Sequence, residues 1–157
     1  MDFSVFLPPT RAEFVMLLRL LLAALAGAAV GWNRHRAGKP AGVGTHAVVA
    51  LGAGLFVAVP ALAGAQHVDA LSRAIQGVAT GVGFLGAGEI FRDPADGTRV
   101  SGLTSAAALW ATAALGIVIA SGSLFGAITA TVLVLAVLEL APRFEKRLPR
   151  RDFPPAG

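Results

Sequence analysis

The sequence predicts an all-α integral membrane bundle of about five transmembrane helices. Hydrophobic residues make up 55% of its 157 residues, charged residues only 14%, and the mean hydropathy is +0.72. A water-soluble domain has about 25% charged residues, and a chain of this length cannot bury so much apolar surface by itself. The apolar runs show none of the apolar–polar alternation of membrane β-strands. The chain is therefore expected to fold as helices in a lipid bilayer.

Five apolar stretches approach the roughly 17–25 residues that a helix needs to cross a bilayer core about 30 Å thick. They are residues 14–32, 43–63, 74–91, 102–121 and 124–140. The first contains a short motif, Ala24-Leu25-Ala26, that resembles a signal-peptide cleavage site. Four more stretches follow it, so we interpret it as a retained anchor. We expect a transmembrane domain over residues 1–141 and a basic, proline-rich cytoplasmic tail without regular structure over residues 142–157.

The positive charges indicate how these helices are oriented. Ten of the 13 Lys and Arg residues fall on one side of the predicted membrane, and only Arg11 and Arg73 fall on the other. Because cytoplasmic loops are enriched in Lys and Arg, the amino terminus is expected outside and the carboxyl terminus in the cytoplasm. The net charge of +4 thus indicates topology, and nucleic acid is not an expected partner.

Small residues recur at steps of four in three of the stretches, which places them on one helical face where two backbones can approach closely. The third stretch carries two such series, so we expect it to be a central helix contacted on two sides. One part of it, from Gly81 to Gly86, matches the dinucleotide motif G-x-G-x-x-G, but it lacks the strand that this motif follows. The glycines expected at helix contacts are Gly27, Gly31, Gly77, Gly81, Gly83, Gly86, Gly88 and Gly116.

Polar residues gather near the predicted cytoplasmic ends of the helices, where ionisable groups are costly and therefore functional candidates. Glu89 and His46 lie at similar depths, and Glu139 lies near the inner end of the last helix. The alternative is that these groups cap helices or pair with nearby arginines. Arg19, inside the first stretch, is expected to extend outward to the interface. The candidate site comprises Thr45, His46, Glu89, Thr104 and Ser105.

Catalytic and metal-binding patterns are not recognisable in the sequence. It has no cysteine, and its three histidines, His35, His46 and His67, fall in different segments. This excludes thiolate metal sites and cysteine nucleophiles. We expect no enzymatic activity, no metal site and no cofactor.

Three blocks resemble the MgtC/SapB family of bacterial inner-membrane proteins. They are RAGKPAGVGTHAVVALGAGLF (36–56), GVATGVGFLGAGEIFR (77–92) and SGLTSAAALWATAALGI (101–117). The resemblance implies a role in magnesium limitation, ion homeostasis and virulence, and action on membrane partners that include ATP synthase. It also implies that the soluble carboxyl-terminal domain of longer members is missing here. The matching positions, which the resemblance adds as functional candidates, are Thr45, His46, Gly83, Gly86, Gly88, Gly102, Thr104 and Trp110, and Trp110 joins the candidate site.

Three positions depart from the family pattern. Asn33 stands where an acidic residue is common, Gly44 where an arginine is common, and Glu89 where an aliphatic residue is usual. Two functions follow as hypotheses. The first is a non-enzymatic protein that modulates membrane partners through its small-residue faces, with a homo-oligomer left open. The alternative is a small cation or proton transporter or channel that uses Glu89 and His46.

Overall fold

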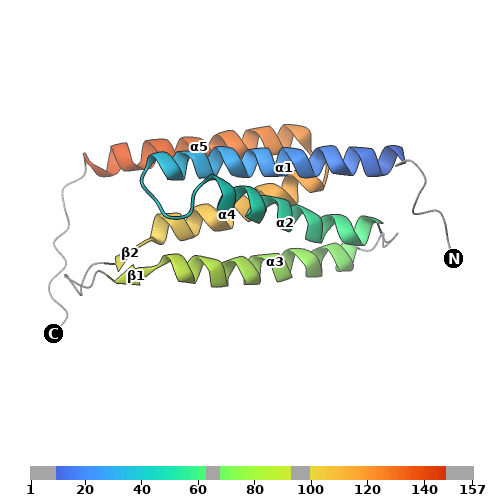
Figure 1. The fold of residues 1–157 in the computed structure, drawn as a ribbon, viewed down its shortest axis with the longest axis horizontal. Coiled ribbons are helices and arrows are strands. Elements are labelled where there is room, and N and C mark those ends of the chain that lie inside the picture. Colours follow the sequence, from blue (N-terminus) through green and yellow to red (C-terminus); the bar gives the residue numbers. More distant parts are fainter. Residues whose placement is uncertain (1–9, 63–67, 93–99, 148–157) are drawn as a thin grey trace.

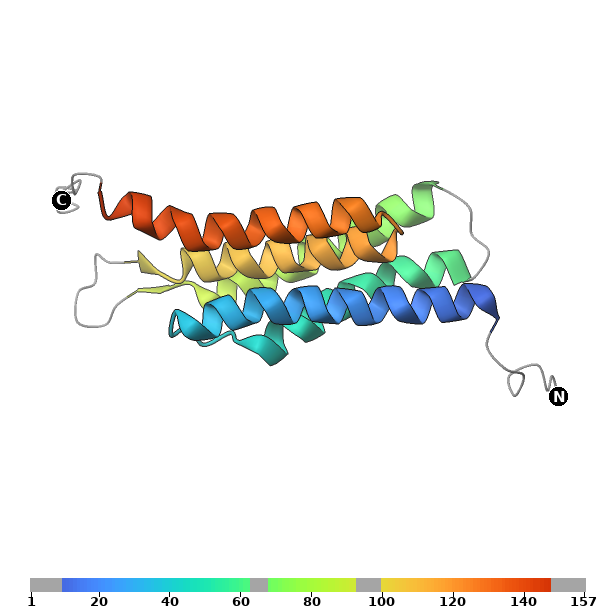
Figure 2. The ribbon, with the colours of Figure 1, turned by 90° about the horizontal axis from the view of Figure 1, so that it is seen from above.

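The computed structural model describes residues 10–62, 68–92 and 100–147. Five helices run along one long axis (Figures 1 and 2). They are α1 (Arg11–Arg36), α2 (Val43–Leu62), α3 (Val68–Glu89), α4 (Leu103–Ala120) and α5 (Leu124–Glu145). The predicted all-α membrane bundle is confirmed. By length and composition α1, α4 and α5 can each cross a membrane, and α2 contributes a shorter apolar stretch, Val43–Val59.

Two helix boundaries differ clearly from the expected ones. α3 begins at Val68, six residues before the predicted start at residue 74. α5 continues past Pro142 to Glu145, so the expected tail begins as helix. Pro142 has no N–H to donate within the helix, but its carbonyl still accepts a bond from the Lys146 N–H. The rest of the predicted tail, residues 148–157, lies outside the described residues.

The central helix is α4, and the expectation that α3 is central is wrong. Nine of the 18 residues of α4 are buried, against one of 22 in α5. Figure 1 shows α2 and α4 between α3 on one side and α1 with α5 on the other. On α3 the inward residues Val78 and Val82 join a core cluster with Leu109, whereas Phe84 is 81% exposed. α3 is therefore a peripheral helix with one packed face.

Glycines let α1 and α4 pack closely on α2 from two directions. A Cβ on Gly27 would collide with the carbonyl of His46, and one on Gly116 would collide with the carbonyl of Ala50. A Cβ on Gly31 would lie 2.6 Å from the Gly42 carbonyl oxygen. Contacts this close are only possible without a side chain, so α2 is held between backbones.

The glycines of α3 behave differently from those of α1 and α4. An added Cβ at Gly77, Gly81, Gly83 or Gly88 would meet no described atom within 4 Å. A Cβ on Gly86 would make only an ordinary contact with Ala106, at 3.5 Å. The expected small-residue faces of α3 are thus largely left open by the other described helices of this chain.

Short connections complete the bundle. A two-stranded antiparallel hairpin that the sequence did not predict, β1 (Phe91–Arg92) and β2 (Val100–Ser101), joins α3 to α4. A tight turn joins α4 to α5, with Gly122 at φ +96° and the Ser123 hydroxyl accepting a bond from the Gly126 N–H.

Arg19 caps the carboxyl end of α4, at the end of the bundle toward which it was expected to extend. Its Nη1 donates to the Ala120 carbonyl at 3.3 Å, and its guanidinium packs against Gly122. A cation at this position stabilises the negative end of the helix dipole. Arg19 therefore has a structural role in holding α1 to the turn between α4 and α5.

Candidate functional site at the basic end of the bundle

The polar site candidates lie at the end of the bundle where α1, α3 and α5 finish and α2 and α4 begin (Figure 1). We call this the basic end. Its described Lys and Arg residues are Arg34, Arg36, Lys39, Arg92, Arg143, Lys146 and Arg147. It contrasts with the opposite end, where the described cations are Arg11, Arg19 and Arg73.

The amino terminus of α2 lies short of the end of α1. Gly42 and Val43 contact Gly31, although α1 continues five residues further, to Arg36. At 1.5 Å per residue, α2 therefore starts roughly 7 Å inside the end of α1, and the connection between them bends back along the bundle (Figure 1). The first N–H groups of a helix have no acceptor within it. Those of α2 lie within the length of the bundle, although Val43, Gly44 and Thr45 are themselves exposed.

His46, in the first turn of α2, is completely buried. Its Nδ1 lies 3.0 Å from the Gly42 carbonyl oxygen. A carbonyl can only accept, so Nδ1 carries the proton that forms this bond. Nε2 is buried and has no hydrogen-bond partner among the described residues. The imidazole is thus oriented by its own helix and presents one unpaired nitrogen.

Arg34, in the last turn of α1, is the functional candidate that the sequence did not single out. Its side chain is only 4% exposed, and its Nε and Nη1 are buried without hydrogen-bond partners in the described part of the chain. Arg34 follows the predicted first span, so from the sequence it is counted among the loop charges that indicate topology. A signal was present, because it follows the inward-facing Val30 and Gly31 by one helical turn and so shares their face.

Glu89, the last residue of α3, completes this group. Arg34 and Glu89 both lie close enough to His46 for their charges to act on it. Glu89 lies at the carboxyl end of α3, beside the start of α4, where a Cβ on Gly102 would collide with its carbonyl. We call Arg34, His46 and Glu89 the Arg34 cluster. The structure thus places two of the predicted site residues, His46 and Glu89, in the same neighbourhood.

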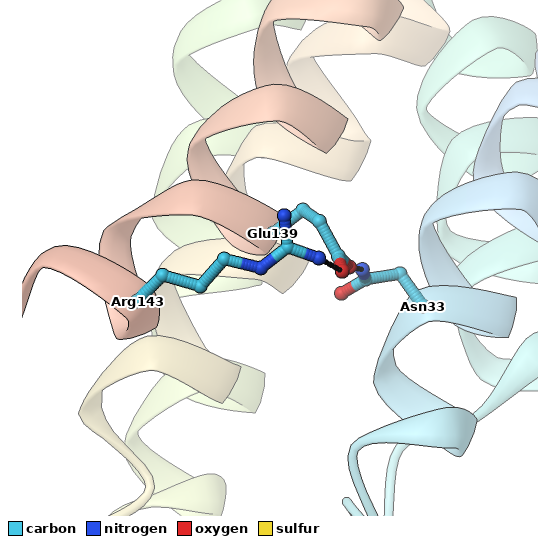
Figure 3. Close-up of polar contacts among 3 residues, drawn as sticks. All are labelled: Asn33, Glu139 and Arg143. Atoms are coloured by element: carbon cyan, nitrogen blue, oxygen red, sulfur yellow. Dashed lines mark hydrogen bonds and ion pairs between the residues drawn. The ribbon is translucent and has the colours of Figure 1, made fainter. Parts of the chain in front are cut away.

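Glu139 belongs to a separate interaction. Its carboxylate accepts a bond from Asn33 Nδ2 at 3.0 Å and pairs with Arg143 Nη2 at 2.6 Å (Figure 3). Asn33 is the residue that stands in place of the family's usual acid, and here it links α1 to α5. The Glu139–Arg143 pair is exposed, so its contribution to stability is small.

The remaining predicted residues do not join the cluster as a single polar layer. Ser105 is buried on α4, whereas Thr45 and Thr104 are exposed at the starts of α2 and α4. Trp110 is 55% exposed on the outer face of α4. In the described part of the chain, no three His, Asp or Glu side chains are grouped so that they could hold a metal ion.

An apolar groove separates α2 from the open face of α3. Its volume is about 610 Å³, and Gly52, Gly77 and Gly81 contribute to its lining. Arg73, near the opposite end of the bundle, is the one charged side chain among the described lining residues. We call this the α2–α3 groove. Its glycines leave helix backbone accessible from the membrane side.

The fold and these sites define a polytopic, all-helical membrane protein with a buried polar cluster at one end. The profile of the MgtC family matches residues 20–147, and the chain belongs to this family.

Similar curated proteins come from several bacteria. Protein SrpB of Synechococcus elongatus is 55% identical over 66% of this chain and 62% of its own length. The putative magnesium transporter YhiD of Escherichia coli K12 is 39% identical over 90% of this chain and 66% of its own. Protein MgtC of Salmonella typhimurium is 37% identical over 78% and 50%. The chain thus spans between half and two thirds of these relatives, and no solved structure matches it.

Proposed function

We propose that this chain is a non-enzymatic regulator in the bacterial inner membrane that acts in magnesium homeostasis by docking a helix of another membrane protein. The magnesium link is supported by the name of its relative YhiD, a putative magnesium transporter. The docking mode is supported by one observation, the α2–α3 groove. The basic end then faces the cytoplasm, because Lys and Arg concentrate there.

The groove has the features of a surface for a transmembrane helix. Lipid provides no hydrophobic drive for association, so helices join where small residues let their backbones approach. Gly77 and Gly81 are one turn apart on α3, and Gly52 faces them from α2. A Cβ added to any of these three glycines would meet no described atom within 4 Å. At Gly27 and Gly116 the space left by the missing side chain is filled by α2 of this chain. In the α2–α3 groove the corresponding space is available to a partner helix.

Charge specifies the partner further. Arg73 lines an otherwise apolar groove, and a cation beside a membrane helix is best compensated by a carboxylate at the same depth. We therefore assign the occupant as an apolar transmembrane helix with an acidic residue near its outer end. From the family resemblance we propose ATP synthase as a candidate for this membrane partner. The same resemblance suggests that the interaction serves virulence.

A matched pair of substitutions tests this function. In a bacterium that lacks its own MgtC-family gene, this chain is expected to restore growth at low magnesium. Gly81→Leu should abolish the rescue because it fills the groove. Gly83→Leu, two residues along α3 and outside the groove lining, should preserve it. Equal growth of the two variants, at equal membrane levels, would refute the docking function.

Transport is the second candidate, because His46 and Glu89 lie within electrostatic reach of each other. Arg34 acts on the same neighbourhood, and a buried guanidinium repels an entering cation. We therefore expect proteoliposomes with the purified chain to take up no more Mg²⁺ or H⁺ than empty liposomes. Uptake that Glu89→Gln abolishes would instead establish the transporter.

A further inference from the structure

The Arg34 cluster contains an uncompensated set of buried hydrogen-bonding groups. Within the described residues, Nε and Nη1 of Arg34 and Nε2 of His46 have no hydrogen-bond partners. Buried polar side-chain atoms nearly always have one, and a buried charge without a counter-charge is costly. Glu89 acts on the cluster through its charge, yet it bonds to none of these three nitrogens.

The amino terminus of α2 adds positive potential to the same region. This helix is 20 residues long and has no acidic residue in its first turn. Its first N–H groups and the positive end of its dipole favour an anion. Because α2 starts at the level of Gly31, this potential acts beside the buried His46, although Val43, Gly44 and Thr45 are exposed.

We propose that Arg34, His46 and the amino terminus of α2 bind a phosphate-type oxyanion. The guanidinium can bond two oxygens of one anion. Nε2 of His46 carries no proton while Nδ1 does, so it accepts a bond from a hydroxyl of the ligand, and the N–H groups of α2 serve a further oxygen. A guanidinium together with several backbone N–H groups suits an anion with several oxygens, such as phosphate, better than a single acceptor atom. The source is either dissolved inorganic phosphate or the phosphate of a lipid headgroup at the basic end.

The structure indicates how an anion could reach the Arg34 cluster and which residue opposes its binding. Arg34 and His46 are closed off in this structure, so an anion enters when the connection between α1 and α2 moves. Four of its residues, Ala37 to Pro40, are exposed. The Glu89 carboxylate opposes binding because its charge repels an anion near His46. Removing that charge should therefore strengthen binding.

The test uses the full-length chain purified in phosphate-free detergent solution. Inorganic phosphate is titrated by calorimetry, and binding to phosphatidylcholine vesicles is measured with and without phosphatidylglycerol. At least one probe should bind. Arg34→Met should weaken that binding about tenfold or more, which is the scale of one lost charged contact. His46→Gln should weaken it less. Arg36→Met, an exposed cation two residues away, is the matched control and should leave binding unchanged.

The outcomes separate the two sources. Arg34-dependent phosphate binding assigns a soluble anion, and Arg34-dependent binding of phosphatidylglycerol vesicles assigns a headgroup. Failure of both probes with the wild-type chain, or equal losses in Arg34→Met and Arg36→Met, would overturn the proposal. Glu89→Gln is a second test that does not depend on whether Arg34→Met folds. Tighter anion binding by Glu89→Gln supports the proposal, and weaker anion binding contradicts it.

Discussion

Gly116→Leu should strongly destabilise this bundle. Gly116 packs on the backbone of α2, where a Cβ would collide with the Ala50 carbonyl. The neighbouring residues Leu115 and Ala113 are also buried, so α4 cannot rotate to make room without disturbing its other contacts. Overpacking a close-packed interior costs typically about 1–3 kcal/mol. Because backbone cannot repack as a side chain can, we expect the upper end of this range.

Thermal unfolding in detergent, followed through Trp32 and Trp110, measures this loss. Gly83→Leu is the matched control, since the same side chain is added to an open helix face. It should change the free energy of unfolding by no more than about 0.5 kcal/mol. Equal destabilisation by both substitutions would show that α2 and α4 do not pack through glycine.

Arg34→Met should make the purified protein more stable. The substitution replaces a buried guanidinium that has two unpaired nitrogens with an apolar side chain. A buried charge without hydrogen-bond partners is costly, and an apolar side chain of similar length removes that cost. In phosphate-free solution the free energy of unfolding should therefore rise, whereas Arg36→Met, on the surface, should leave it nearly unchanged.

Chemical unfolding of the two variants and the wild type checks this expectation. Adding the proposed anion should narrow the difference, because a ligand that binds only the folded wild type stabilises it. A loss of stability in Arg34→Met without any anion would show that the guanidinium makes favourable contacts, contrary to its unpaired state in the structure.

Much of the fold could be predicted because membrane helices are encoded locally. The length and apolarity of each stretch indicate a helix without knowledge of its neighbours. Steps of four also identified Gly27, Gly31 and Gly116 as contact positions, and the structure places all three against α2 or the residues that lead into it. The same rule could not show that Gly77 and Gly81 face outward. A small-residue series looks identical whether its neighbour belongs to the same chain or to another.

The buried cluster was harder to predict because it depends on where a connection turns. Arg34 follows the predicted first span and reads as a loop cation, yet α1 extends to Arg36 and the next six residues bend back into the bundle. That bend brings α2 alongside α1 and buries His46, in the first turn of α2. The Asn33–Glu139 contact likewise joins residues 106 positions apart. Nothing in local periodicity encodes such a pairing.

The most direct test of the docking function is photocrosslinking in native membranes from within the α2–α3 groove. A photoreactive amino acid at position 81 should crosslink to a peptide from a transmembrane helix of another membrane protein, with an acidic residue near its outer end. The same amino acid at position 83 should give no such crosslink, because Gly83 does not line the groove. Crosslinks from position 81 only to a second copy of this chain, or only to lipid, would contradict the docking function.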